Sequence, residues 1–251
     1  MKDEIIYGIN PVLEALRSGR RAFELFTARG GTDRRLEKIL AAAGEKGVPV
    51  RQREKPDLAR LCGTDHHQGV ALRVEPFPYA DLSDIVVRWR NSGESGLLLV
   101  LDGIQDPHNL GALIRTAACA GAHGVVIPKD RAAGVTAAVE KAAAGATETI
   151  PVARVANIAQ SLDELKRHGF WVYGALGDAP ESLYGQDFTG NVAFVIGAEG
   201  EGVRSLVRKT CDLLIAIPLA GGVNSLNASV AGGIVLFEAV RQRRGAAADR
   251  G

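Results

Sequence analysis

Apolar residues follow two rhythms along this chain. From residue 96 onward, short continuous apolar runs alternate with segments in which apolar residues recur every three or four positions. Continuous runs are typical of strands buried on both faces, and their alternation with helices predicts a parallel sheet covered by helices on both sides. The predicted strands are 97–101, 124–127, 150–152, 170–175, 193–196 and 213–217, and the predicted helices are 110–120, 136–144, 158–168 and 230–240.

The first 75 residues predict a smaller α/β unit. Its expected strands are 23–28, 48–51 and 69–74, and its expected helices are 11–18, 35–46 and 56–61. The proline- and glycine-bearing stretch that follows breaks the pattern, although 82–89 is compatible with a short helix. We therefore expect an α/β protein with an N-terminal domain (1–76), a linker (77–95) and a C-terminal domain (96–251).

Composition restricts the class of protein. The chain has 251 residues, of which 46% are hydrophobic and 24% charged, as in an ordinary globular protein. We find no apolar run long enough to span a membrane, and the charged start MKDEII does not resemble a signal peptide, so we expect a cytoplasmic location. Cys62, Cys119 and Cys211 are odd in number and widely spaced, which predicts reduced, mostly buried thiols rather than disulfides or a zinc site.

Charge is unevenly distributed between the two predicted domains. The formal net charge is +3 over residues 1–76 and −1 over residues 96–251. This imbalance favours the N-terminal domain as the one that contacts a polyanion. On charge alone, however, a solvated basic face is the preferred explanation.

Polar loops follow three of the predicted strands. Strand 97–101 leads into DGIQDPHN, strand 193–196 into GAEGEG, and strand 213–217 into a proline and then AGGVNSLNAS. Loops at the carboxyl ends of neighbouring parallel strands form ligand sites. The candidate ligand-binding side chains are Asn109, Glu199, Asn224, Ser225, Asn227 and Ser229. The last two loops contain no Lys, Cys or His, which argues against a phosphate or metal site.

Each of these residues also has a structural explanation. Asn109, Ser225 and Asn227 are well placed to cap the helices that follow them, and Glu199 is compatible with a solvent-facing loop charge. Arg115 lies in an otherwise apolar helix, where an ion pair with a nearby carboxylate would explain it. The glycines of GAEGEG follow the order G-x-x-G-x-G, unlike the dinucleotide-binding motif, and allow the backbone to approach a flat ligand closely.

A pair of histidines, His66 and His67, forms an HHQG turn in the N-terminal domain. No cysteine or carboxylate stands at metal-ligand spacing from them. We interpret them as polar turn residues that can contact RNA.

Three motifs in order carry a resemblance to a known family. They are N-x5-R at Asn109 and Arg115, G-x-E-G-x-G beginning at Gly197, and I-P-L-x5-SLNAS from Ile217 to Ser229. Together they resemble the TrmH family of the SPOUT RNA 2′-O-ribose methyltransferases. The segments IYGINPVLEALRSGR and HHQGVAL resemble the small RNA-binding domain of its RlmB-type branch, which methylates a guanosine of 23S ribosomal RNA. Leu219 departs from the family pattern, where methionine is common.

The resemblance implies a C-terminal SPOUT domain tied in a deep trefoil knot, and a homodimer whose sites use both subunits. It implies S-adenosylmethionine as cofactor, held mainly by backbone groups and without a metal. The residues that it assigns to the cofactor are Gly197, Ala198, Ile217, Leu219 and Leu226. Those that it assigns to catalysis are Asn109, Arg115, Glu199, Ser225 and Asn227.

The general base stays open. The resemblance implies that Arg115, engaged with an RNA phosphate, helps to deprotonate the ribose hydroxyl. An arginine is ordinarily too basic for that role, so stabilising the phosphate and the developing alkoxide is an equal alternative.

The expected function is ribose 2′-O-methylation of ribosomal RNA. Three alternatives stay open: a tRNA ribose methyltransferase, an RNA-binding protein that keeps a cofactor pocket without catalysis, and a nicotinamide-dependent dehydrogenase.

Overall fold

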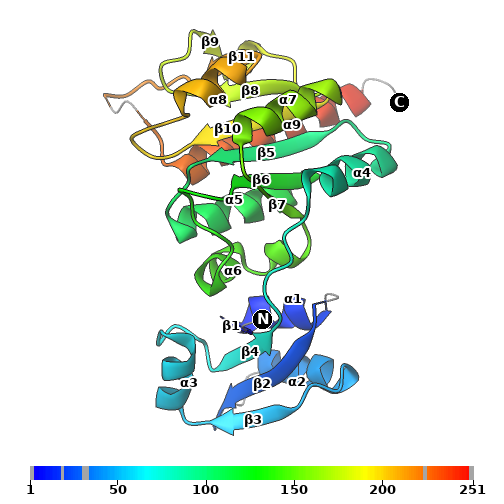
Figure 1. Cartoon of the computed structure of the whole chain (residues 1–251), viewed down its shortest axis with the longest axis vertical. Coiled ribbons are helices and arrows are strands. Elements are labelled where there is room, and N and C mark those ends of the chain that lie inside the picture. Colours follow the sequence, from blue (N-terminus) through cyan, green and yellow to red (C-terminus); the bar gives the residue numbers. More distant parts are fainter. Residues whose placement is uncertain (1–2, 18–19, 30–33, 223–224, 249–251) are drawn as a thin grey trace. The chain divides into compact units, whose positions relative to one another are not determined.

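The described residues form two compact units. The computed structural model describes residues 3–17, 20–29, 34–222 and 225–248 (Figure 1). The N-terminal unit contains the chain up to Pro78 together with Val135–Thr149, and the C-terminal unit contains Tyr79–Gly134 together with the chain from Ile150 onward. The segment Val135–Thr149, which the sequence pattern places in the C-terminal domain, thus packs with the N-terminal unit.

The N-terminal unit is built on a four-stranded sheet. The strand order is β1-β4-β2-β3, with β2 and β3 parallel and the other neighbours antiparallel. The strands are β1 (Glu4–Tyr7), β2 (Ala22–Ala28), β3 (Val50–Arg53) and β4 (Val70–Val74), and the helices are α1 (Ile9–Arg17), α2 (Arg34–Glu45), α3 (Lys55–Cys62) and α6 (Ala137–Ala143). The sequence pattern missed β1 and placed β3 two residues too early, because every residue of β3 is exposed and its ladder with β2, not apolar periodicity, sets its bounds.

Helices cover both faces of this sheet. On one face, Val12 and Leu16 of α1 and Ile39 of α2 pack with Leu25 and Leu72 of the sheet. On the other face, Leu58 of α3 packs with Tyr7, Phe26 and Ala71. The alternation of inward residues along β2 and β4 therefore supplies two small apolar cores.

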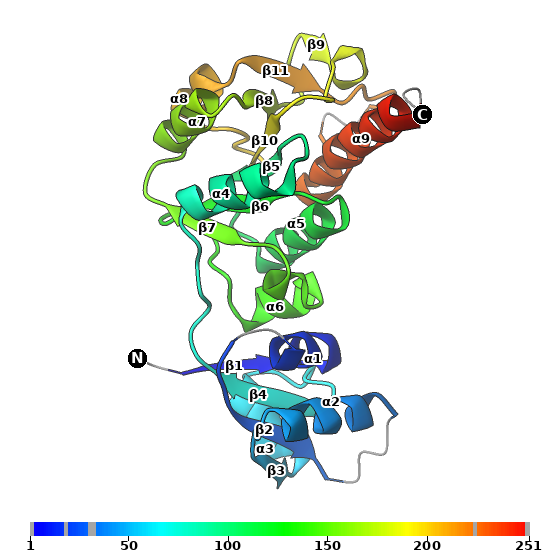
Figure 2. The same cartoon turned by 90° about the vertical axis from the view of Figure 1, so that its right-hand side faces the viewer.

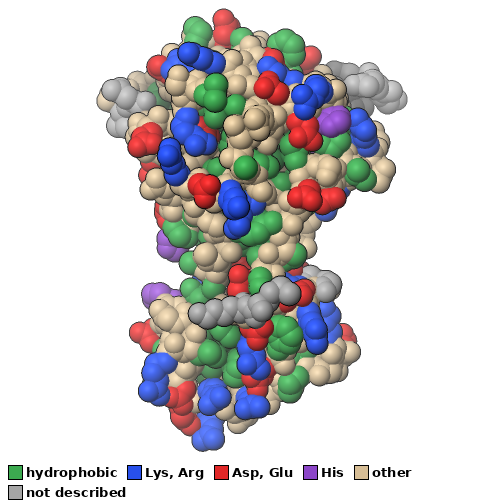
Figure 3. Space-filling model, viewed as in Figure 1, with side chains coloured by type: hydrophobic (Ala, Val, Ile, Leu, Met, Phe, Trp, Pro, Cys, Tyr) green, Lys and Arg blue, Asp and Glu red, His purple; other side chains and the backbone are tan. Residues whose placement is uncertain are grey.

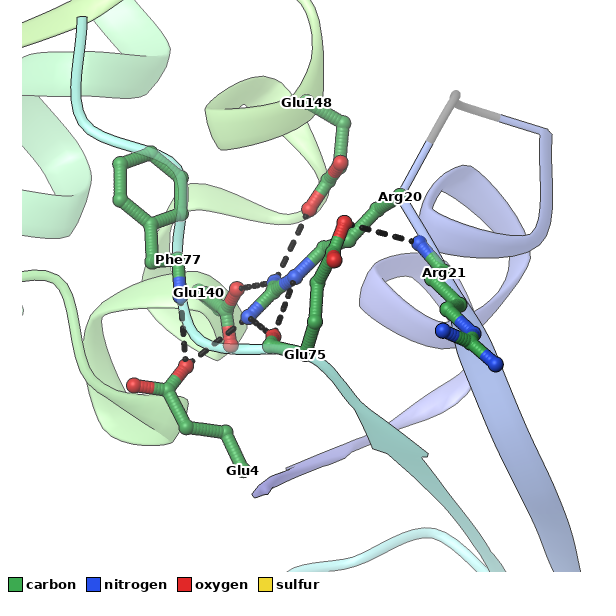
Figure 4. Close-up of polar contacts among 7 residues, drawn as sticks. All are labelled: Glu4, Arg20, Arg21, Glu75, Phe77, Glu140 and Glu148. Atoms are coloured by element: carbon green, nitrogen blue, oxygen red, sulfur yellow. Dashed lines mark hydrogen bonds and ion pairs between the residues drawn. The ribbon is translucent and has the colours of Figure 1, made fainter. Parts of the chain in front are cut away.

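A buried arginine ties the inserted segment to this unit (Figure 4). The Arg20 side chain is 1% exposed and donates hydrogen bonds to three carboxylates. Its partners are Glu4 on β1 at 2.8 Å, Glu140 on α6, and Glu148 in the 3₁₀ helix Ala146–Glu148 at 3.2 Å. It also donates to the Glu75 carbonyl oxygen at 2.8 Å. One positive charge therefore faces three carboxylates, of which Glu140 and Glu148 are buried, so the burial of these two is only partly compensated.

Glu140 should make the stability of the N-terminal unit depend on pH. Burial raises the pKa of Glu140 to about 7 from an ordinary value of 4.5, although the charge of Arg20 opposes the shift. Between these values the folded unit keeps a proton that the unfolded chain releases, so stability should fall as pH rises and level off above pH 7.

The substitution Glu140→Gln should remove this dependence. From pH 5 to pH 7.5 the wild-type chain should lose about 2 kcal/mol of unfolding free energy relative to the variant. Urea unfolding of both proteins at each pH measures the difference, in which the titration of other groups cancels. Parallel stability curves for the two proteins would contradict the assignment.

The C-terminal unit contains a seven-stranded sheet in the described residues. Its strand order is β7-β6-β5-β10-β8-β11-β9, and every pair of neighbours is parallel. The strands are β5 (Leu97–Asp102), β6 (Gly124–Pro128), β7 (Val152–Val155), β8 (Trp171–Ala175), β9 (Glu181–Ser182), β10 (Val192–Gly197) and β11 (Leu213–Ala216). The predicted α/β fold with a parallel sheet is confirmed, although β7 begins two residues later than predicted and the two-residue β9 was not predicted.

Helices lie on both faces of this sheet (Figure 2). One face carries α4 (Leu82–Ser92), α7 (Ile158–Arg167) and α8 (Ser205–Thr210), and the other carries α5 (Pro107–Cys119) and α9 (Ala228–Ala248). The helices α5 and α9 approach closely, since a Cβ at Gly232 would lie 2.3 Å from a methyl carbon of Leu113. The short helix α8 was not predicted from the sequence.

The structure also bears on the state of the cysteines and on the presence of membrane-spanning helices. The cysteines are free thiols, but Cys119 is exposed and Cys62 and Cys211 are half-buried, so the prediction of mostly buried thiols was wrong. Among the described helices, none is both long and apolar enough to cross a bilayer.

Candidate active site

The carboxyl ends of β5 and β10 lie side by side in the C-terminal unit. The ladder pairs Asp102, the last residue of β5, with Gly197, the last residue of β10. The loop after β5 leads to α5, the loop after β10 leads to α8, and the segment after β11 leads to α9. Parallel pairing therefore brings the three motif-bearing loops to one edge of the sheet.

Glu199 connects these loops by hydrogen bonds. Its Oε1 accepts from the side-chain amide of Asn109 at 3.0 Å and from that of Asn227 at 2.6 Å. The Asn227 amide also donates to Asn109 Oδ1 at 3.0 Å, which closes a triangle of three side chains. The backbone N–H of Ala228 lies 3.4 Å from the same carboxylate oxygen. One carboxylate thus fixes the orientation of two amides from distant parts of the chain.

Asn227 serves the fold and this network at once. Its Oδ1 accepts from the backbone N–H of Ser229 at 2.9 Å and of Val230 at 3.3 Å, which caps the N-terminus of α9. Its Nδ2 points to Asn109 and Glu199. The capping explanation is therefore correct for Asn227, and it does not exclude a role in a site.

Asn109 does not cap α5. The helix begins at Pro107, and Asp106 is the N-cap, accepting from the backbone N–H of His108. The predicted start at residue 110 was three residues too late, because proline at the first helical position extends the helix backwards. Asn109 instead lies buried inside the first turn, where its side chain turns to Glu199.

A second carboxylate holds the glycine loop after β10 in place. Asp102 is fully buried and accepts from the Arg204 backbone N–H at 2.8 Å and from Arg204 Nε at 2.7 Å. Within the loop, Ala198 and Gly202 exchange two backbone hydrogen bonds. A Cβ at Gly197 would lie 2.1 Å from the Gly202 carbonyl carbon, so only glycine fits there.

A cavity of about 700 Å³ opens beside this loop. It is lined by backbone and side chains of the loops after β8, β10 and β11, within the size range of small-molecule sites. The predicted residues that line it are Gly197, Ala198, Glu199, Ile217, Leu219, Ser225, Leu226 and Asn227. Sequence reasoning missed Asp178 and Arg208, which also line it and form an ion pair at 3.3 Å. Their signal was weak, because each is one charge in a loop or in the unpredicted helix α8.

Three predicted residues in the described part of the chain stand outside this lining. The Ser229 hydroxyl donates to Asn227 Oδ1 at 2.5 Å. Asn109 reaches the site through Glu199. Arg115 is exposed on α5, and in the described part of the chain its guanidinium forms no ion pair or hydrogen bond. The ion-pair explanation for Arg115 is therefore not supported, and its charge is available to a molecule outside this chain. Asn224 lies outside the described residues.

The site is built of amides, hydroxyls, carboxylates and backbone groups. Among the described residues, no cluster of three or more His, Cys, Asp or Glu side chains is arranged to hold a metal ion.

The chain matches two family models. Residues 96–237 match the SpoU rRNA Methylase family, and residues 5–80 match the RNA 2'-O ribose methyltransferase substrate binding family. The 23S rRNA (guanosine-2'-O-)-methyltransferase RlmB of Ralstonia nicotianae is 46% identical over 96% of this chain and 97% of its own length. The enzyme of the same name from Escherichia coli is 44% identical over 96% of this chain and 99% of its own.

A solved structure agrees with these matches. The SpoU methyltransferase AviRb from Streptomyces viridochromogenes, in complex with the cofactor AdoMet, superposes with a TM-score of 0.82 at 28% identity. The match covers 97% of this chain and 91% of that one, so it includes both units.

Two substitutions should separate the capping role of Asn227 from its contacts with Glu199. Asn227→Asp keeps an oxygen that can cap α9 but loses the amide donor and places a second carboxylate against Glu199. Asn227→Ala loses both functions and should destabilise the chain by about 1 kcal/mol through the cap alone.

Amide hydrogen exchange measures the outcome. In Asn227→Asp the Ser229 and Val230 amides should stay protected, whereas in Asn227→Ala both should exchange faster. Equal loss of protection in the two variants would show that the cap depends on the contact with Glu199.

Proposed function

The chain belongs to the SpoU rRNA methylase family, and we propose that it transfers a methyl group from S-adenosylmethionine to the ribose 2′-hydroxyl of a guanosine in 23S rRNA. The observation that carries this proposal is the cavity beside the glycine loop, which the Glu199 network closes on one side. A ligand in the cavity would lie next to amides that can orient a ribose hydroxyl.

The cavity fits S-adenosylmethionine chemically. Its glycine loop exposes backbone groups, since Gly197 and Gly202 carry no side chains there, and Ile217, Leu219 and Leu226 supply apolar walls. Backbone groups recognise the polar edges of an adenine or ribose, and apolar side chains contact its faces. We propose that Gly197, Ala198, Ile217, Leu219 and Leu226 hold the cofactor.

When bound, S-adenosylmethionine supplies an activated methyl group, so the protein must align the hydroxyl and manage its proton. We propose that Asn109, Glu199, Ser225 and Asn227 orient the ribose and the loops. Arg115 would bind the adjacent RNA phosphate and stabilise the developing alkoxide, because its permanent charge suits electrostatic stabilisation better than proton abstraction.

We propose a homodimer in which Arg115 of one subunit reaches the site of the other subunit. Val230, Ile234 and Phe237 recur along α9 at helical spacing, and Val230 and Phe237 are 49% and 48% exposed. Such an apolar stripe is typical of an interface, and it lies on the helix that packs against α5, which carries Arg115. We propose that a second copy covers this stripe and receives Arg115 in its own site. We also propose that the C-terminal unit is tied in a trefoil knot and that the protein is cytoplasmic. Both are expected of an RNA-modifying member of this family.

Methyl transfer from labelled S-adenosylmethionine to unmodified 23S rRNA, and separately to tRNA, tests the reaction. Label in alkali-resistant dinucleotides from 23S rRNA is expected, because 2′-O-methylation blocks cleavage of the next phosphodiester. Label in tRNA alone would support ribose 2′-O-methylation but contradict 23S rRNA as the substrate. Cofactor binding without label in either RNA would contradict the proposed reaction.

Arg115→Ala should keep the affinity for S-adenosylmethionine and lower methyl transfer at least about 10²-fold. Isothermal titration and single-turnover transfer measure the two quantities, with Arg115→Lys as the variant that retains charge. Mixing Arg115→Ala subunits with Glu199→Ala subunits should restore about a quarter of wild-type activity, because half the dimers then hold one intact site. No recovery would mean that Arg115 acts in its own subunit.

The dimer itself can be tested at the α9 stripe. Phe237→Glu should yield monomers in light scattering, because a buried carboxylate without a partner is costly at an interface. Leu206→Glu is the matched control, since Leu206 is an apolar residue that is 62% exposed on α8. A monomeric wild-type chain, or a dimer that tolerates Phe237→Glu, would refute the proposed interface.

A further inference from the structure

The N-terminal unit contains a cavity of its own, with a volume of about 620 Å³. Its walls come from the start of α1, the end of β2, the start of α2, the start of α3 and the loop before β4. Apolar side chains, among them Ile9, Leu36 and Pro56, line it together with several polar groups. A concave, mostly apolar space with a few polar groups is the usual form of a ligand site.

His67 supplies an accessible hydrogen-bond donor at this cavity. The residue lines the cavity and is 5% exposed, but its Nε2 is not among the buried atoms that lack a partner. Its Nδ1 accepts from the backbone N–H of Gly69 at 2.9 Å, so the neutral ring carries its proton on Nε2. In the described part of the chain, Nε2 has no hydrogen-bond partner. Because Nε2 is not buried, a ligand with an acceptor atom can reach this donor.

The backbone that presents His67 is strained. Gln68 has a φ of 56°, in the left-handed region that side chains other than glycine rarely adopt. Its Oε1 accepts from the backbone N–H of Ile9 at 3.0 Å, which anchors the loop to the start of α1. Such strain persists where the surrounding structure enforces it, and it is concentrated at binding sites.

Two cations, Arg29 and Lys55, and one exposed carboxylate, Asp65, line the same cavity. Lys55 is exposed and forms no ion pair among the described residues. Arg29 pairs with Glu54 at 3.0 Å, but both side chains are more than half exposed, so this pair is weak and a phosphate can replace it. Lys and Arg side chains are also spread over the visible face of the N-terminal unit (Figure 3). Apolar walls, one inner donor and exposed cations match the parts of a nucleotide.

We propose that this cavity receives one unpaired nucleotide of the RNA substrate. The base enters between the apolar walls and accepts a hydrogen bond from His67 Nε2 through a carbonyl oxygen or ring nitrogen. Lys55 and Arg29 bind the flanking phosphates. The inference rests on the proposed function in one respect, namely that the substrate is RNA, and it identifies where the N-terminal unit reads an unpaired base.

Two variants of His67 separate loss of the Nε2 donor from loss of the hydrogen bond that the Gly69 N–H donates to Nδ1. His67→Asn keeps an oxygen that can accept from the Gly69 N–H but lacks the Nε2 donor. His67→Gln places an amide donor near the Nε2 position. Binding of in vitro transcribed 23S rRNA should weaken about tenfold in His67→Asn and recover in part in His67→Gln, as expected for one lost hydrogen bond.

Lys55→Ala tests the phosphate contact at an exposed position that should not disturb folding. Affinity should fall several-fold, and the slope of log K against log salt should drop by about one, whereas His67→Asn should leave that slope unchanged. Arg60→Ala is the control, because Arg60 is an exposed cation on α3 that does not line the cavity.

A fully paired RNA duplex distinguishes base capture from plain charge attraction. Wild type and His67→Asn should bind the duplex equally, since it offers no unpaired base. Equal affinity of wild type, His67→Asn and Lys55→Ala for 23S rRNA would overturn the inference. This outcome is distinct from failure of the proposed function, in which the wild-type chain does not methylate 23S rRNA whatever its affinity.

Discussion

The site depends on one carboxylate oxygen that gathers three separate stretches of the chain. Glu199 Oε1 accepts from Asn109, Asn227 and the first backbone N–H of α9, and these donors come from loops more than a hundred residues apart. The parallel ladder between β5 and β10 puts the loops within reach, and the hydrogen bonds from Arg204 to the buried Asp102 hold the glycine loop in place. Without this oxygen, the side-chain amides of Asn109 and Asn227 and the backbone N–H of Ala228 would lose their acceptor.

Structural and functional explanations of a polar residue are not exclusive in this molecule. Asn227 caps α9 through its oxygen and reaches the site through its nitrogen, so the stability of the helix fixes the orientation of the amide. Arg115 shows the opposite case. Its exposed guanidinium has no partner among the described residues, so no contact found within the chain explains an arginine in that helix.

Local patterns predicted most of the elements and the loops that carry the cavity. Buried parallel strands such as 97–102 are continuous apolar runs, and the loops that follow them hold the polar residues. The sequence did not predict features that depend on other segments of the chain or on the residues that begin a helix. β3 takes its bounds from β2, α5 gains a turn from Asp106 and Pro107, and the Asp178–Arg208 pair forms only because the loop after β8 meets α8. The cavity around His67 is of the same kind, since its walls come from five places in the sequence.

The inserted segment Val135–Thr149 changes how the two units are connected. It leaves the C-terminal unit between β6 and β7, adds α6 to the N-terminal unit and returns, so the chain passes between the units at three places. Arg20 holds the inserted segment in the N-terminal unit, because it is the buried counter-charge of Glu140 and Glu148. Deletion of residues 1–76 would therefore remove Arg20 and leave two carboxylates of the inserted segment without it.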